Sequence, residues 1–148
     1  MSELFAPVLT LDGPSATGKG TVAAEVAKDC GWGLLDSGAL YRAFAYIADQ
    51  KGVVVDDDAA IRLLGNELDL KCYLGPEGTA VILWGDVTLT DQIRTESVAQ
   101  RASYTPNSLP CGRRFFNSSV PIGAYRDLSQ MVVIWAPGYF PMLKSKFF

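Results

Sequence analysis

Short apolar runs and helix-compatible segments alternate along the first fifty residues of the chain. Residues 7–11 are mostly aliphatic or β-branched and end at Asp12-Gly13, which predicts a buried strand and a tight turn. From Lys19 to Asp29, apolar side chains recur every three or four residues, and this spacing predicts a helix. The expected inner face of that helix consists of Val22, Ala23, Val26 and Ala27.

A second strand and a second helix follow in the same order. Residues 32–35 predict the strand, and residues 39–50 place Leu40, Phe44 and Ile47 on one helical face. Because strand and helix alternate twice, we expect an α/β fold with a doubly wound parallel sheet flanked by helices. Residues 1–51 would form the first half of this core.

Residues 52–89 interrupt the alternation and predict a small insert made of a helix and a β-hairpin. The run 56–58 is three Asp residues, which can cap a helix. The strand-like runs 70–74 and 80–84 flank a Gly-Pro-Glu-Gly turn. The inner face of the helix is expected to carry Ile61, Leu64 and Leu68.

The pattern changes again after the insert. Thr90 can cap a return helix over residues 90–103, with Ile93 and Val98 facing inward. Residues 104–148 contain scattered prolines and no amphipathic pattern that we can assign. We therefore expect an atypical tail after the return helix.

The composition limits the possible chemistry. Thirteen Lys and Arg stand against sixteen Asp and Glu, a formal net charge of −3, so the basic excess typical of nucleic-acid binding is absent. No residue of the 148 is His, which excludes imidazole-based triads and His-ligated zinc. The three cysteines are too far apart for a zinc-type pair and predict reduced thiols. With no signal peptide or spanning helix recognisable, we expect a cytoplasmic monomer that binds neither membrane nor nucleic acid.

A glycine-rich loop lies between the first predicted strand and its helix, where phosphate-binding loops occur. Its glycines let the backbone N–H groups turn toward phosphate oxygens, and the helix N-terminus adds partial positive charge. Lys19 can reach the β and γ oxygens, and the Thr21 hydroxyl can bind phosphate or the hydration shell of Mg²⁺. The predicted nucleotide-binding residues are Gly13, Pro14, Ser15, Ala16, Thr17, Gly18, Lys19, Gly20 and Thr21.

Two details of this loop leave alternatives open. The usual pattern has Ser or Thr directly after the Lys, whereas Gly20 intervenes here, so a direct contact of Thr21 with the metal is not assigned. Asp12 either orients hydrated Mg²⁺ or bonds its own backbone as a turn residue.

A second polar loop, Asp36-Ser37-Gly38, follows the second predicted strand and would face the same crevice. Arg42, one turn into the next helix, carries a planar fork suited to a phosphate, and Tyr41 precedes it. From the spacing alone, an equally good interpretation is that Asp36 or Ser37 caps the helix and Arg42 is solvated.

These segments together resemble bacterial cytidylate kinase. The resemblance rests on residues 11–15, 18–21, 34–42 and 93–96, and extends over about residues 5–103. It implies a P-loop NTPase-type fold in which residues 52–89 form the nucleoside-monophosphate-binding subdomain. It also implies transfer of the ATP γ-phosphoryl group to CMP or dCMP, with ATP and Mg²⁺ required.

The resemblance also implies roles for individual residues. Ser37 and Arg42 would hold the acceptor phosphate, and Ser103 would contact the cytosine. Asp36, Gly38 and Tyr41 belong to the same substrate loop. Lys19 and Arg42 would be catalytic, because phosphoryl transfer needs alignment and charge neutralisation and no covalent intermediate.

The family pattern does not continue past Ser103. Read in a shifted frame, residues 131–137 can be encoded by codons that yield Asp-Gly-Arg-Asp-Met-Gly-Thr, a family segment missing from its usual place. We therefore hypothesise a frame slip near Ser103 and another near Ser129, with an independently evolved tail as the alternative. Because the family's acceptor clamp and lid are missing, we expect little turnover. Two other functions stay open: a non-catalytic ATP-binding fragment, and a P-loop kinase for another small acceptor.

Overall fold

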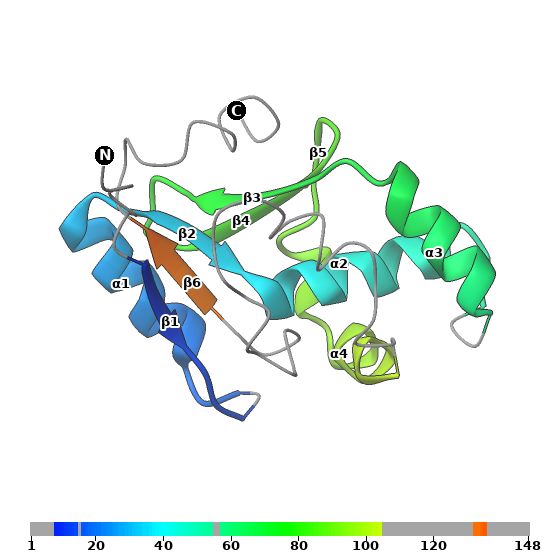
Figure 1. The fold of residues 1–148 in the computed structure, drawn as a ribbon, viewed down its shortest axis with the longest axis horizontal. Helices are drawn as coiled ribbons and strands as arrows, with labels where there is room; N and C mark the ends of the chain where they lie inside the picture. The colour runs from blue at the N-terminus through cyan, green and yellow to red at the C-terminus, as the bar shows by residue number, and fades with distance from the viewer. Residues whose placement is uncertain (1–7, 15, 55–56, 105–131, 136–148) are drawn as a thin grey trace, which may run out of the picture.

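The computed structural model describes residues 8–14, 16–54, 57–104 and 132–135 of the chain. Helices and strands alternate through these ranges and give a mixed α/β architecture (Figure 1). The elements are β1 (Val8–Leu11), α1 (Lys19–Cys30), β2 (Gly33–Asp36), α2 (Ser37–Gln50), α3 (Asp58–Glu67), β3 (Leu70–Leu74), β4 (Ala80–Trp84), β5 (Val87–Thr88), the 3₁₀ turn η1 (Gln92–Arg94), α4 (Glu96–Ser103) and β6 (Val132–Trp135).

The first sheet has the order β1-β6-β2, and it corrects the prediction of a parallel sheet. β6 lies between β1 and β2 and pairs antiparallel with both, with Thr10 and Leu35 each opposite Val133. Because both neighbours run opposite to β6, β1 and β2 point in the same direction, as the strand–helix alternation predicts. Their parallel hydrogen bonds are absent because an apolar, β-branched segment from far along the chain occupies the space between them.

Helix α1 covers one face of this sheet (Figure 1). Its buried residues are Ala23, Ala24 and Ala27, which pack against Leu34 of β2 and Val132 of β6. Val22 was predicted on the inner face but is 51% exposed, so this part of the prediction is wrong. Small alanine side chains bring the helix backbone close to the sheet and hold the start of α1 in place.

Helix α2 forms the centre of a second and larger core. Phe44 and Ile47 are fully buried, as the periodicity predicts, and pack with Ile61 and Leu64 of α3. The β3–β4 hairpin contributes Ile82 to the same core. The predicted helix and hairpin of the insert are therefore both present, with β5 added as a third strand in the order β3-β4-β5.

The return segment after the insert is not one helix. Residues 92–94 form a 3₁₀ turn, Thr95 is extended with φ −76° and ψ 148°, and α4 begins only at Glu96. Thr90 does not cap it: its Oγ1 instead accepts a hydrogen bond from the Ile82 N–H, 3.2 Å away. Ile93 and Val98 are nevertheless buried, as predicted, because turn and helix both pack on the second core.

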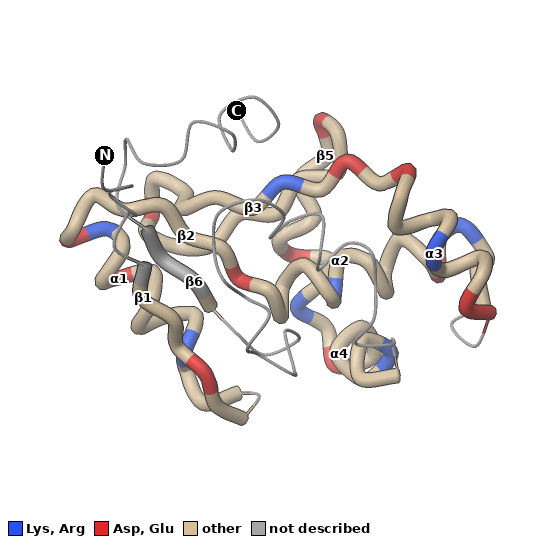
Figure 2. The backbone as a smooth tube through the Cα atoms, viewed as in Figure 1, with Lys and Arg blue, Asp and Glu red and all other residues tan. Residues whose placement is uncertain are grey.

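Acidic and basic positions are interspersed along α1, α3 and α4 (Figure 2). The Asp58–Arg62 pair in α3 is 3.0 Å apart and exposed, and Arg101 of α4 pairs with Asp49 of α2. The second pair helps to hold α4 beside α2. Among the helices that the structure describes, none combines the length and apolar character needed to cross a membrane.

Candidate active site

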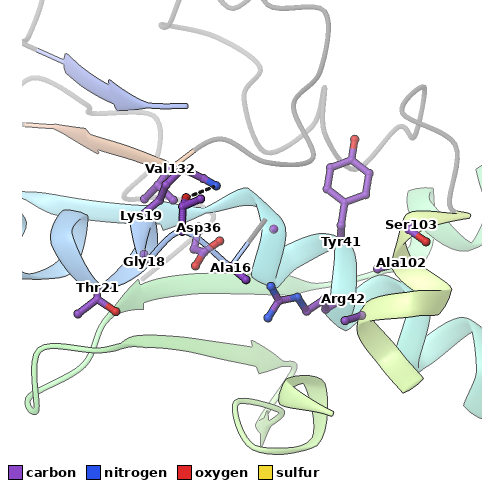
Figure 3. A pocket seen from close by; sticks show the side chains of 14 residues that line it. Ala16, Gly18, Lys19, Thr21, Asp36, Tyr41, Arg42, Ala102, Ser103 and Val132 are labelled. Atoms are coloured by element: carbon purple, nitrogen blue, oxygen red, sulfur yellow. Dashed lines mark hydrogen bonds between the residues drawn. The ribbon is translucent and has the colours of Figure 1, made fainter. Parts of the chain in front are cut away.

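A cavity of about 310 Å³ opens where the starts of α1 and α2 meet the end of α4 (Figure 3). Its volume is in the range of small-molecule sites. Both loops predicted from the sequence contribute to it. The lining residues are Ala16, Thr17, Gly18, Lys19, Gly20, Thr21, Asp36, Gly38, Tyr41, Arg42, Ala99, Ala102, Ser103 and Val132.

The phosphate loop leads into α1 through a left-handed residue. Gly18 is the N-cap with φ 81°, and no side chain bonds the first amides of the helix. The first turn of α1 also contains no acidic residue. The N–H groups at this end and the positive end of the helix dipole are therefore available to an anion in the cavity.

The Lys19 ammonium is folded back onto the loop that precedes it. Nζ donates to the carbonyl oxygens of Gly13 at 2.6 Å and Pro14 at 2.5 Å, and lies 3.5 Å from Oγ1 of Thr17. The Thr17 hydroxyl itself donates to the Pro14 oxygen at 2.9 Å. These contacts hold the loop around the ammonium, so a bound phosphate would meet a cation already at the cavity wall.

The second loop contributes an adjoining wall of the cavity. Asp36 ends β2 and caps α2, with Oδ1 accepting from the Ala39 N–H at 3.0 Å. Gly38 and Arg42 then line the cavity from the first turns of α2. In Figure 3 the Arg42 side chain extends toward the phosphate loop, whereas Tyr41 leaves the helix in another direction. The helix thus places one guanidinium opposite the Lys19 side of the cavity.

Not every predicted site residue reaches the cavity. Ser37 is 1% exposed and is not a lining residue, because the first turn of α2 directs it into the interior. Gly13 and Pro14 also do not line the cavity, and Ser15 lies outside the described residues. The structure places the Asp12 carboxylate on the Gly13 N–H at 2.7 Å, which favours the turn interpretation over the metal one.

Helix α4 closes the third side. Ser103 lines the cavity as expected, and its hydroxyl donates to the Gln100 carbonyl at 2.6 Å. Ala99 and Ala102 beside it were not predicted. Ala99 lies four residues before Ser103, and this spacing could have found it, since residues three and four apart share a helical face. Ala102 is three residues after Ala99 and shares that face with it. Val132 of β6 was not predicted either, and only the fold brings it here.

A thiol lies beneath the second loop. Cys72 of β3 is buried, and its Sγ accepts from the Asp36 N–H at 3.4 Å. Burial raises the pKa of this thiol to about 12, against an ordinary value of 9.0; the Asp36 N–H opposes the shift and the Asp36 carboxylate adds to it. At neutral pH the thiol is protonated, so Cys72 supports the loop and is not a nucleophile.

Oxygen ligands for a metal are few in this cavity. Within the ranges that the structure covers, no three His, Cys, Asp or Glu side chains are grouped to hold an ion. Thr21 has a hydroxyl at the cavity wall. Magnesium commonly retains waters and binds through substrate phosphates, so this sparse donor set fits Mg²⁺ arriving with a nucleotide.

Comparison with known proteins decides the family. The family model described as cytidylate kinase matches residues 9–117. The chain belongs to the cytidylate kinase family. The match continues to residue 117, which is further than the resemblance to residue 103 predicted from the motifs.

Curated cytidylate kinases from bacteria are similar to this chain over its N-terminal part. The enzyme of Pseudomonas fluorescens strain Pf0-1 is 48% identical over 101 residues, which are 67% of this chain and 44% of that protein. The enzyme of Pseudomonas syringae pv. tomato is 46% identical over 113 residues, 75% of this chain and 48% of that protein. The enzyme of Methylococcus capsulatus is 47% identical over 97 residues, 66% and 43% of the two chains. The matched part thus spans less than half the length of these cytidylate kinases.

Proposed function

We propose that this chain acts as a nucleoside monophosphate kinase, which transfers the γ-phosphoryl group of ATP to CMP or dCMP and gives ADP and CDP or dCDP. The observation that carries the proposal is a single cavity lined by the phosphate loop, the start of α2 and the end of α4. A kinase for nucleoside monophosphates needs a donor site and an acceptor site that share one space. Family membership supports the choice of cytidylate as acceptor.

The chemistry follows from the charges around the cavity. Lys19 and the free amides of α1 would hold the donor phosphates, and Arg42 would hold the acceptor phosphate in line with them. Ser37 would join Arg42 only if the start of α2 exposes it on binding. Ser103, at the end of α4, would contact the base. We assign residues 52–89 to the acceptor-binding subdomain and the reaction to the cytoplasm.

Magnesium would be held mainly by the donor phosphates and by waters, with the Thr21 hydroxyl bonded either to the ion or to one of its waters. The ion supplies charge neutralisation on the transferred group. The protein residues then have to orient the two nucleotides and exclude water. Lys19 leaves the Gly13 and Pro14 carbonyls to meet the phosphates, exchanging neutral acceptors for charged ones.

A second function, nucleotide binding without turnover, is favoured by one observation. Of the described residues that line the cavity, only Lys19 and Arg42 are cationic. A triphosphate and a monophosphate together carry more negative charge than two cations neutralise. We therefore expect this chain to bind MgATP and CMP but to turn them over slowly.

Turnover and binding measurements separate these functions. Coupled assays of ADP release with CMP, dCMP, UMP and AMP identify the acceptor, and calorimetry with MgATP and CMP measures binding. CMP-dependent ADP release supports the kinase, and binding without release supports the second function. A preference for UMP or AMP would contradict the assigned acceptor.

Lys19→Ala tests the phosphate loop directly. Because Lys19 would make a charge-assisted contact with the donor phosphates, we expect MgATP affinity to fall about 10-fold to 100-fold. Lys28→Ala, which removes an exposed lysine from the same helix, is the matched control and should leave the affinity unchanged. Equal MgATP affinity of Lys19→Ala and the unmodified chain would reject the proposed donor site.

A further inference from the structure

Gly20 separates Lys19 from Thr21, where phosphate loops commonly have Ser or Thr directly after the lysine. The proposed phosphoryl transfer does not explain this glycine. Gly20 lies in the first turn of α1 and does not have a positive φ, unlike the neighbouring Gly18. Its backbone conformation is open to any residue, so conformational freedom is not the reason for glycine here.

Space is the reason that the structure offers. A Cβ built on Gly20 would lie 3.0 Å from Oδ2 of Asp36. This distance is shorter than ordinary van der Waals contact, so either the carboxylate or the start of α1 would have to shift. A serine or threonine at position 20 would place a Cβ at this same short distance from the carboxylate.

Asp36 has little freedom to shift. Its Oδ1 accepts from the Ala39 N–H at 3.0 Å and caps α2, and its own N–H donates to Cys72 Sγ at 3.4 Å. One residue therefore bonds the first turn of α2 and the β3 strand of the hairpin, and its other carboxylate oxygen lies where a side chain on Gly20 of α1 would begin. Gly20 and Asp36 both line the cavity, and they are neighbours in its wall.

We propose that Asp36 is a positioning residue that sets the separation between the phosphate loop and the acceptor helix α2, and that Gly20 provides the space its carboxylate needs. The positioning role rests on the proposed kinase function, because it concerns how donor and acceptor are aligned. The steric part stands on the geometry alone. A side chain at position 20 would move Asp36, and with it the start of α2, where Gly38 lies in the first turn and Arg42 in the second.

The test combines Gly20→Ala with two substitutions of Asp36. D36S keeps a side chain that can cap α2 but removes the second oxygen, whereas D36N keeps both the cap and the size. We expect G20A to lower Tm by about 3 °C or more in the unmodified chain and in D36N. In the D36S background we expect G20A to raise Tm by about 1–3 °C, because alanine favours helix over glycine once the clash is gone.

The affinity for CMP tests the positioning role of Asp36. We expect G20A to weaken CMP binding about tenfold in the unmodified chain, and less than about threefold when it is added to D36S. If the unmodified chain binds neither CMP nor MgATP, the proposed function fails, while the melting comparison still decides the steric part. If CMP binds but G20A weakens it equally in both backgrounds, Asp36 does not position the acceptor.

Every melting result decides the steric proposal. Equal Tm changes on adding G20A to the unmodified chain and to D36S overturn it, and so does failure of both G20A proteins to fold. Asp36→Gly is a second variant without the carboxylate, and it allows the Tm change caused by G20A to be measured without a serine at position 36. We expect it to remove the G20A penalty as D36S does.

Discussion

Cys72 illustrates how one buried residue links the hairpin to the loop between β2 and α2. Its thiol accepts from the Asp36 N–H, and burial raises its pKa to about 12. Desolvation is the main cause because a thiolate has no water around it there, and the nearby Asp36 carboxylate adds repulsion. The residue contributes to stability only while it is protonated.

The pH dependence of stability follows from this shift. Below pH 9 the thiol is protonated in both folded and unfolded chains, and its stabilising contribution is complete. Above pH 9 the unfolded chain ionises while the folded thiol does not, so we expect the free energy of unfolding to fall progressively toward pH 12. The Cys72→Ala variant has no thiol at this position to ionise. The difference in free energy of unfolding between it and the unmodified chain should therefore shrink as the pH rises from 9 toward 12. Urea titrations at several pH values measure the difference, and a constant difference would contradict the prediction.

Ala16 is the described non-glycine residue with a positive φ, at 62°. The left-handed conformation costs an L-residue with a Cβ about 1–2 kcal/mol, part of which glycine recovers. We expect Ala16→Gly to raise the free energy of unfolding by up to about 1 kcal/mol, measured by chemical denaturation. Ala59→Gly in the exposed first turn of α3 is the control and should lower it. Loss of stability in Ala16→Gly would show that this loop conformation is not strained.

At the scale of elements, side-chain periodicity predicted which segments form helices and that Ala23 and Ala27 are buried in α1, but it did not predict the burial of Ala24. Phe44 and Ile47 identify the buried face of α2, because both side chains are large and apolar and only one orientation of the helix buries them together. In α1 the more apolar Val22 is exposed and Ala24 is buried, because close approach to the sheet selects small side chains. The break at Thr95 was not predictable from local capping, since the hydroxyl of Thr90 has a partner on β4.

The cap of α3 was predicted from three consecutive aspartates, and the structure selects Asp57, whose Oδ1 accepts from the Ala60 N–H at 3.0 Å. We expect Asp57→Ala to destabilise the chain by about 1 kcal/mol because an end amide of the helix loses its partner. Asp58→Ala removes an exposed ion pair with Arg62 and a negative charge from the first turn of α3, and it should cost less than Asp57→Ala. Thermal unfolding of the two variants compares them, and an equal loss of stability would contradict the assignment of the cap.

At the scale of the whole molecule, the candidate site combines loops that the sequence revealed with a strand that it did not. The glycine loop and Arg42 were predicted because their residue types serve one chemistry at fixed spacing. Val132–Trp135 was assigned to an atypical tail, because four apolar residues among prolines do not identify a pairing partner. The site role of Ser37 stays a prediction, since its burial depends on how the start of α2 is oriented. The hypothesised frame slips near Ser103 and Ser129 concern residues that lie largely outside the described ranges.

Val132 tests whether β6 holds the first sheet together. It is 3% exposed and packs with the alanine face of α1 and with Leu34. We expect Val132→Ala to lower the free energy of unfolding by about 2 kcal/mol, through lost burial and a cavity beside α1. Leu9→Ala on the neighbouring strand removes a side chain that is 45% exposed and should cost about half as much or less. If the two variants lose equal stability in denaturant titrations, the burial of Val132 in β6 does not stabilise the first sheet as proposed.

The alanine face of α1 restricts which residues the chain can accept far from any nucleotide. Ala23, Ala24 and Ala27 are 0–2% exposed, so a valine at any of them would overfill the interface by about 1–3 kcal/mol or push the helix outward. Lys19 begins the same rigid helix, so an outward push would tilt its ammonium as well. The residues tolerated at these three alanines are therefore limited by the position of Lys19 in the candidate site as much as by folding, and we expect only glycine or serine to leave that position unchanged.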